Sequence, residues 1–166
     1  MRVLFVEPPK DVWFVMGEYL PPPFGIIQLA AYLEREVEGI GVEVLDCNAE
    51  KLDWRGLERY MESLEPDIVA SSALATCNTY TVARTLETAK RVNPEILTVT
   101  GGQHFTATAQ ESLEAYPEID VIVRGRGRRP SKSSSPTPRT PQASGRLGGS
   151  PSDMGVGSSK GPPQSS

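Results

Sequence analysis

A short apolar run passes into small and hydroxyl residues in the middle of the chain, at Ile68-Val69-Ala70-Ser71-Ser72-Ala73-Leu74-Ala75-Thr76. Short apolar runs rich in β-branched residues predict buried strands. Such runs occupy residues 3–6, 42–45, 68–70, 96–99 and 121–123. Amphipathic stretches separate them, so the sequence predicts five strands that alternate with helices and form a parallel sheet through right-handed crossovers.

Apolar residues at helical spacing predict a helix in each of the four intervals between these runs. The first helix stops before Gly39, the second is capped by Asp53 and ends at Pro66, the third ends at Asn93, and the fourth lies near residues 106–115. This order of elements is typical of an α/β, flavodoxin-like doubly wound fold. Its five-stranded parallel sheet has the strand order 2-1-3-4-5.

In a sheet of this kind, ligands bind outside the carboxyl ends of the strands. The loops that leave those ends begin at Glu7, Asp46, Ser71, Gly101 and Arg124. Small and hydroxyl residues dominate three of the five loops. Small side chains let a broad ligand approach the main chain, and loop amides and helix N-termini can meet phosphate or amide groups.

The predicted domain is acidic, whereas the C-terminal segment is basic. The chain has 17 Lys+Arg and 21 Asp+Glu, but seven of the basic residues and only one of the acidic residues lie in residues 125–166. That segment is rich in Ser, Gly and Pro and has no aromatic residue, so it is predicted to be disordered. The expected organisation is a domain over residues 1–125 and a Ser/Pro/Gly/Arg-rich tail over residues 126–166.

Composition argues against several classes of protein. No apolar run approaches the ~20 residues that span a bilayer, and the N-terminus does not resemble a signal peptide, so a soluble, cytoplasmic protein is expected. The acidic domain does not favour nucleic-acid binding, which requires clustered Lys and Arg. Cys47 and Cys77 are too few for a disulfide scaffold, a zinc site or an iron–sulfur site, and buried or loop thiols are the favoured interpretation.

Six pieces of sequence, taken in order, resemble one known family. They are Val6-Glu7-Pro8-Pro9, Pro22-Pro23-Phe24-Gly25 with residues 29–34, residues 44–49, Pro66-Asp67-Ile68-Val69 with Ser72, Gly101-Gly102-Gln103-His104, and residues 120–125. Residues 1–125 thus resemble the N-terminal cobalamin-binding domain of cobalamin-dependent radical S-adenosylmethionine enzymes. The resemblance implies cobalamin (vitamin B12) as the cofactor and a radical S-adenosylmethionine domain as the partner.

The resemblance also implies a cobalamin site in the loops that follow the strands. Ser72-Ala73-Leu74 and Gly101-Gly102 would line a slot for the nucleotide tail of the cofactor. The implied cofactor-binding residues are Pro8, Pro9, Ser72, Ala73, Leu74, Thr76, Gly101, Gly102, Gln103, His104 and Gly125. Structural roles remain alternatives for some of them: a tight turn at Gly101-Gly102, and helix capping by Ser72 or Thr76.

His104 is the only histidine of the chain, and it follows the fourth run rather than the first. Three hypotheses remain for it: contact with the polar periphery of the cofactor, axial ligation of cobalt, or an ordinary helix-start or surface residue. The thiolates of Cys47 and Cys77 are further alternatives as cobalt ligands, against inert thiols. No metal ligand and no catalytic residue is assigned.

The sequence departs from the family after residue 125. A glycine–glutamate repeat is replaced by Gly125-Arg126-Gly127-Arg128, and the tail replaces the last covering helix, as a frameshift would produce. The iron–sulfur motif Cys-x-x-x-Cys-x-x-Cys and the Asp-x-His-x-x-Gly signature of methyl-carrier domains are both absent. The expected function is a cobalamin-binding module of a radical S-adenosylmethionine protein such as a methyltransferase, without the catalytic domain. The alternative is a non-catalytic flavodoxin-like fragment or interaction module that binds no cofactor.

Overall fold

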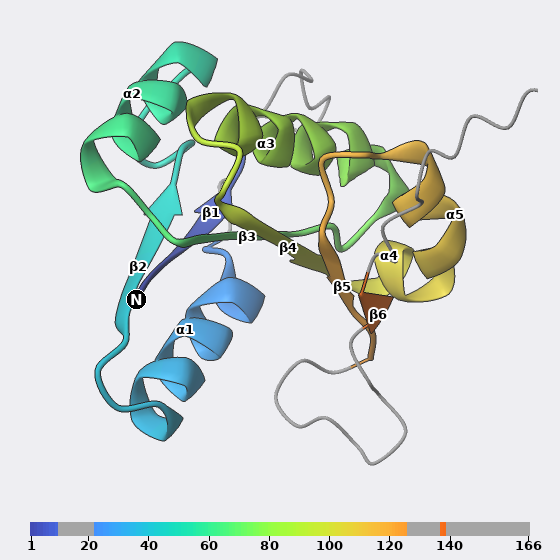
Figure 1. Ribbon diagram of the computed structural model, residues 1–166, viewed down its shortest axis with the longest axis horizontal. Helices are drawn as coiled ribbons and strands as arrows, with labels where there is room; N and C mark the ends of the chain where they lie inside the picture. Colours follow the sequence, from blue (N-terminus) through green and yellow to red (C-terminus); the bar gives the residue numbers. More distant parts are fainter. Residues whose placement is uncertain (10–21, 126–136, 139–166) are drawn as a thin grey trace, which may run out of the picture.

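The computed structural model describes residues 1–9, 22–125 and 137–138, which form one sheet with helices on both faces (Figure 1). Along the chain the elements are β1 (Arg2–Glu7), α1 (Phe24–Glu36), β2 (Gly41–Asp46), α2 (Trp54–Leu64), β3 (Ile68–Ser72), the 3-10 turn η1 (Thr76–Asn78), α3 (Thr79–Val92), β4 (Leu97–Gly101), α4 (Gln103–Ala107), α5 (Ala109–Ala115), β5 (Val121–Val123) and β6 (Thr137–Pro138).

Five strands are parallel and lie in the order β2-β1-β3-β4-β5, which confirms the predicted fold class and strand order. Strand β6 joins the sheet antiparallel to β5, within the segment predicted to be a tail. The sequence does not predict this strand, because its two residues carry no strand signal and the pairing depends on tertiary contact. The rest of the predicted tail lies outside the described residues.

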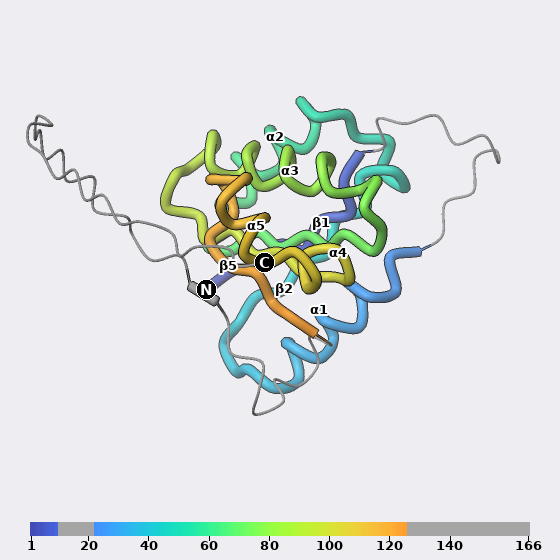
Figure 2. The backbone as a smooth tube through the Cα atoms, turned by 90° about the vertical axis from the view of Figure 1, so that its right-hand side faces the viewer, coloured from blue at the N-terminus to red at the C-terminus, as the bar shows by residue number. Residues whose placement is uncertain are grey.

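The main hydrophobic core lies between the sheet and the layer of helices formed by α2, α3, α4 and α5. In both views, α2 and α3 lie on the side of the sheet opposite α1 (Figure 1; Figure 2). Alternate side chains of the strands enter this core, and helical side chains meet them there. The largest fully buried members are Leu4, Leu57, Met61, Leu86, Ile96, Phe105, Ile119 and Ile122, and Val6, Val69 and Val82 are buried with them. Burial of these side chains is the main stabilising contribution to the fold.

Among the described helices, only α1 covers the opposite face of the sheet, and it lies near β1 and β2. Ile26 and Ala30 of α1 are buried against it. Farther along the same face, Leu97 is 40% exposed and Val123 is 38% exposed, with the half-buried Val99 between them. We call these three residues and the strands that carry them the open face. Parallel sheets are normally buried on both faces, so this exposed apolar surface is unusual for a sheet of this class.

Helix α2 begins and ends as the sequence predicts. The Asp53 carboxylate accepts a hydrogen bond from the Gly56 N–H at 2.7 Å, which satisfies one of the free amides of the first turn. At the other end, Glu65 has a φ of +50° and closes the helix before Pro66.

The fourth predicted helix, near residues 106–115, is corrected by the structure. It begins earlier, at Gln103, and is divided at Thr108 into α4 and α5. The Thr108 hydroxyl donates to the His104 carbonyl oxygen at 3.0 Å and lies 2.9 Å from the Ser112 hydroxyl. Threonine side chains that bond the preceding turn in this way bend or interrupt helices.

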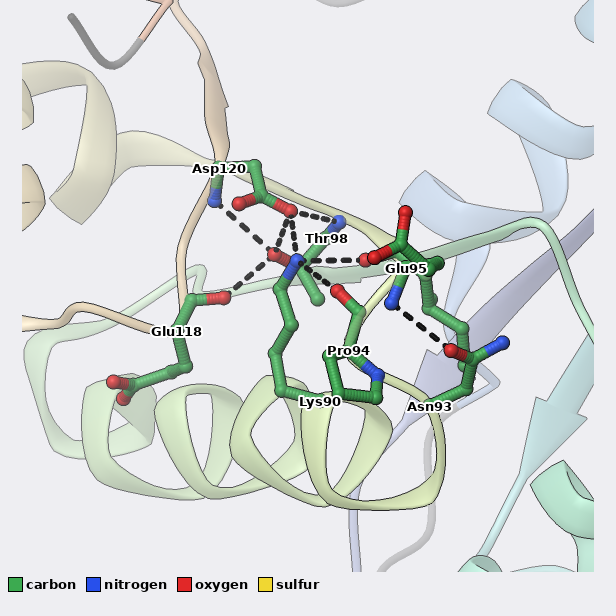
Figure 3. A network of polar contacts seen from close by, with 8 residues as sticks. Lys90, Asn93, Pro94, Glu95, Thr98, Glu118 and Asp120 are labelled. Atoms are coloured by element: carbon green, nitrogen blue, oxygen red, sulfur yellow. Dashed lines mark hydrogen bonds and ion pairs between the residues drawn. The ribbon is translucent and has the colours of Figure 1, made fainter. Parts of the chain in front are cut away.

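A polar network ties the amino ends of β4 and β5 to the end of α3 (Figure 3). Lys90 Nζ lies 2.5 Å from Asp120 Oδ2 and donates to the Ile96 carbonyl oxygen at 2.8 Å. The same carboxylate oxygen accepts the Thr98 N–H and lies near the Thr98 hydroxyl, both at 2.9 Å. Burial raises the pKa of Asp120, but the hydrogen bonds from Lys90 and Thr98 and the charge of Lys90 outweigh it, so the pKa is lowered from 3.8.

Candidate functional site

The carboxyl ends of β1, β3, β4 and β5 lie along one edge of the sheet, and the predicted cofactor-binding residues follow them directly. Strand pairing places Ser72 of β3 beside Gly101 of β4. Pro8 and Pro9 follow β1, and Gly125 comes two residues after β5. The strands therefore bring the predicted residues to one edge, where doubly wound sheets bind ligands.

The loops after β3 and β4 touch through their main chains. The Ala73 N–H donates to the Gly101 carbonyl oxygen at 3.2 Å. Gly102 has a φ of +96°, and a Cβ atom on it would lie 2.3 Å from the Ala73 carbonyl oxygen and 2.9 Å from Ser72 Oγ. Only glycine satisfies both this dihedral angle and this approach. The loops after β3 and β4 are therefore in direct contact at Gly102, and a slot for a nucleotide tail along these residues stays a prediction.

The small residues at the end of β3 and β4 continue onto the open face. Ser72 and Gly101 alternate along their strands with residues that enter the main core, so both belong to the face that α1 covers. A Cβ atom on Gly101 would lie 3.1 Å from the Val123 carbonyl oxygen, so β4 and β5 also approach closely here. The candidate site is thus continuous with Val99 and Val123 of the open face.

The loop after β3 turns one side chain into the core and the next toward solvent. Ala73 is fully buried in the hydrophobic core, so it can present only its main chain to a ligand. Leu74 is 72% exposed, and Thr76 is exposed as well. Covering an exposed leucine is worth about 1.5–3 kcal/mol, so Leu74 is the side chain of this loop that gains most from a ligand.

His104 bridges the loops after β3 and β4. Its Nδ1 lies 3.3 Å from the Thr76 hydroxyl, and its ring meets the fully buried Phe105 edge-on with 5.3 Å between centroids. The neighbouring Gln103 is exposed. Since Nδ1 faces Thr76, Nε2 is the nitrogen left to meet a ligand, and this position suits contact with a polar group at the periphery of a cofactor.

Asn48 and Thr106, which the sequence does not mark as site residues, form hydrogen bonds at the two ends of this edge. The buried Pro8 accepts a hydrogen bond on its carbonyl oxygen from Asn48 Nδ2 at 2.9 Å. At the other end, the Gly125 N–H donates to the Thr106 hydroxyl at 3.1 Å. A single loop amide or helical hydroxyl belongs to no sequence motif, so these two hydrogen bonds could not be predicted from the sequence.

Two buried hydroxyl groups near this edge were also missed. Thr79 begins α3 and Thr100 precedes Gly101 in β4, and they are 3% and 2% exposed. Neither side-chain oxygen has a hydrogen-bond partner among the described residues. Leaving such a group unpaired costs about 1–3 kcal/mol, and a ligand or an ordered water commonly supplies the partner.

The two thiols differ in environment. Cys47 is fully buried, and burial together with the charges of Asp46 and Glu7 raises its pKa to about 12. It is therefore a neutral thiol at physiological pH and a poor ligand for a metal. Cys77 is exposed in η1, where its Sγ lies 3.2 Å from Asn78 Oδ1.

Residues 1–9, 22–125 and 137–138 hold neither a membrane-spanning helix nor a cluster of metal ligands. Over these ranges, no helix has the length and apolar character needed to cross a bilayer. The His, Cys, Asp and Glu side chains of the same ranges form no group of three that could hold a metal ion. The candidate site combines main-chain groups, small side chains and hydroxyl groups with Pro8, Pro9, Leu74, Gln103 and His104.

The fold and this edge define a ligand-binding domain of the doubly wound class. A family model described as the B12 binding domain matches residues 14–133. The chain belongs to this family, and its cofactor is cobalamin, as the sequence predicts.

Three relatives and one solved structure extend the comparison. The chain is 33% identical over 131 residues to an uncharacterized methyltransferase of Pyrococcus horikoshii, a match that covers 76% of this chain and 27% of that protein. It is 37% and 33% identical to the anaerobic magnesium-protoporphyrin IX monomethyl ester cyclases of Rubrivivax gelatinosus and Cereibacter sphaeroides, covering 76% of this chain and 22% and 20% of those proteins. The chain thus spans about a quarter or less of the length of these relatives. A cobalamin-binding protein from Desulfitobacterium hafniense aligns with a TM-score of 0.48 and 11% identity, over 76% of this chain and 53% of that one.

Proposed function

We propose that this domain holds cobalamin at the carboxyl edge of its sheet for use by a radical S-adenosylmethionine catalytic domain. The observation that best supports the location is Leu74, a 72% exposed leucine beside the contact of Ala73 with Gly101 and Gly102. The relatives named as a methyltransferase and as cyclases are several times longer than the match, which supports a catalytic region elsewhere in such proteins.

The residues present at this edge fit the chemistry of cobalamin. The corrin ring is broad and partly apolar, its rim carries amide groups, and its nucleotide tail needs space beside the protein main chain. Leu74 offers apolar contact area, and the Thr76 hydroxyl and His104 imidazole offer hydrogen bonds to amides. Ser72 and Gly101 lead onto the open face, where the described helices leave sheet surface uncovered for the tail.

When bound, cobalamin supplies a cobalt centre that can carry a methyl group or exchange electrons. The residues of this chain place and shield it. Leu74 covers part of the ring and excludes water from that area, while Thr76 fixes the ring orientation of His104 so that Nε2 faces the periphery. The sequence has no histidine between β1 and β2, so no imidazole is available at the position of the usual lower ligand in methyl-carrier domains.

Hydroxocobalamin titrated into the folded chain is expected to bind with its own nucleotide base displaced from cobalt and with no histidine in its place. The visible spectrum should therefore be of the base-off type. Leu74→Gln should weaken binding about tenfold, because it removes apolar contact worth about 1.4 kcal/mol or more. His104→Ala should weaken binding only about threefold, because it loses one peripheral hydrogen bond.

Val37→Gln is the matched control, because Val37 is also an exposed aliphatic residue but follows the last turn of α1, at the opposite end of the sheet from the site. It should leave the affinity unchanged. The absence of any spectral change with excess cobalamin in a folded sample would contradict the proposal and favour an interaction module without cofactor. A histidine-ligated spectrum that disappears in His104→Ala would keep the cofactor but assign its ligand to His104.

The catalytic partner is tested separately, on the coding DNA. Reading past codon 125 in all three frames should reveal a Cys-x-x-x-Cys-x-x-Cys motif, the ligand set of the required iron–sulfur cluster. Stop codons in every frame without this motif would contradict the assignment to a radical S-adenosylmethionine protein. That result would leave cobalamin binding itself untouched.

A further inference from the structure

None of the described strands pairs with β2 on the side away from β1, and we call this side the free edge of β2. The Gly41 N–H donates to the Met1 carbonyl oxygen at 3.0 Å, and the Cys47 N–H donates to the Glu7 carbonyl oxygen at 3.1 Å. Main-chain groups alternate along a parallel strand, so the odd-numbered residues of β2 face β1. The N–H and C=O groups of Val42 and Val44 therefore point outward, where the described sheet has no further strand.

A pocket of about 650 Å³ runs along this free edge. Its walls come from both sides of the strand: from the start of α1, from the second half of β2 and the loop after it, and from α2. The lining residues are Pro22, Pro23, Ile27, Val44, Leu45, Asp46, Ala49, Glu50, Leu52 and Tyr60. Within this lining Ile27 is 43% exposed and Val44 is 38% exposed. Apolar walls beside an unpaired strand edge are the features that β-strand addition uses.

The pocket is acidic as well as apolar. Asp46 and Glu50 contribute carboxylates to the lining, and none of the described lining residues is Lys, Arg or His. The Tyr60 hydroxyl donates to Glu43, which holds a third carboxylate close to the wall. An occupant with apolar and basic side chains would complement this surface, because alternate side chains of an added strand point to opposite sides.

We propose that the free edge of β2 is a docking site for an extended segment of a partner protein in which apolar and basic residues alternate. The segment pairs with the outward main-chain groups of Val42 and Val44. One row of its side chains enters the pocket, and its basic side chains lie near Asp46 and Glu50. The pocket lies at β2, which β1 separates from β3 and β4, and peptide binding can be measured in the absence of cobalamin.

The test uses the full chain and a short blocked peptide of alternating lysine and valine, with binding measured by fluorescence anisotropy. We expect saturable binding that weakens as salt is added, since exposed charges are screened. The same peptide methylated on alternate main-chain nitrogens, and an analogue with glutamate in place of lysine, should bind at least about tenfold more weakly. Equal binding of the methylated peptide would overturn strand pairing.

The matched variants are Val44→Lys and Val123→Lys, because both valines are strand residues with 38% exposure and they lie at opposite ends of the sheet. Val44→Lys should weaken peptide binding about tenfold or more, whereas Val123→Lys should leave it within about twofold. Glu50→Lys, in an exposed loop position, should also weaken binding and serves if Val44→Lys does not fold. No saturable binding to the wild-type chain, or equal losses in the two valine variants, would overturn the proposal.

Discussion

Gly102→Ala is expected to lower the free energy of unfolding by roughly 3 kcal/mol or more, from backbone strain and overpacking together. The added Cβ atom would lie 2.3 Å from the Ala73 carbonyl oxygen, which is main chain and cannot rotate away. The φ of +96° adds strain for any residue other than glycine. Urea denaturation followed by circular dichroism measures this loss.

Gly125→Ala separates the two causes. Gly125 also has a positive φ, of +80°, but a Cβ atom there would have no neighbour within 4 Å. Its substitution should cost only about 1 kcal/mol, from the dihedral angle alone. Equal losses of unfolding free energy in Gly102→Ala and Gly125→Ala would show that the close contact of Ala73 with Gly102 adds no cost to that of the dihedral angle. A larger side chain, as in Gly102→Leu, would disturb the same contact between the two loops. A loss of cobalamin binding in that variant would therefore not by itself identify the binding slot.

Asp120→Asn is expected to lower the free energy of unfolding by about 2 kcal/mol at pH 7, because it leaves Lys90 without its charge partner in a largely buried network. The folded pKa of Asp120 lies below its ordinary value, so the carboxylate contributes stability above the unfolded pKa and loses it as pH falls through the folded pKa. The wild-type chain should therefore lose stability below about pH 4 more steeply than the variant.

Asp67→Asn is the control for this network. Asp67 precedes β3 as Asp120 precedes β5, and its carboxylate also accepts a main-chain hydrogen bond, from the Arg2 N–H at 2.6 Å. Its side chain is 61% exposed, however, and exposed ion pairs contribute little. A variant of Asp67 that matched Asp120→Asn in both stability and acid sensitivity would argue against a special role for Lys90.

The fold could be predicted from sequence because its signals are local and repeated. Each short apolar run places at least one side chain in the main core, and the cap at Asp53 and the stop at Pro66 each depend on a few neighbouring residues. The break at Thr108 could not be predicted, because threonine is common inside helices and its effect depends on where the hydroxyl bonds.

The location of the candidate site could also be predicted, but its geometry could not. Small residues after β3 and β4 point to a ligand edge in a doubly wound sheet. The contact of Gly102 with Ala73 depends on where the fold places Ala73, and no sequence pattern specifies that position. The unpaired hydroxyls of Thr79 and Thr100, and the pocket along β2, likewise exist only once distant elements have come together.

Because of the open face, the strands of the sheet differ in the free energy that their local opening requires. Strand β1 has paired neighbours on both edges and helices over both faces, whereas β5 has three residues and one face that no described helix covers. Segments with little buried apolar surface open at a lower free energy than the core does. Opening that begins at β5 reaches Gly101 through its pairing with Val123 before it reaches β3. Any segment or ligand group that covers Leu97, Val99 and Val123 would therefore slow amide exchange along the cofactor edge.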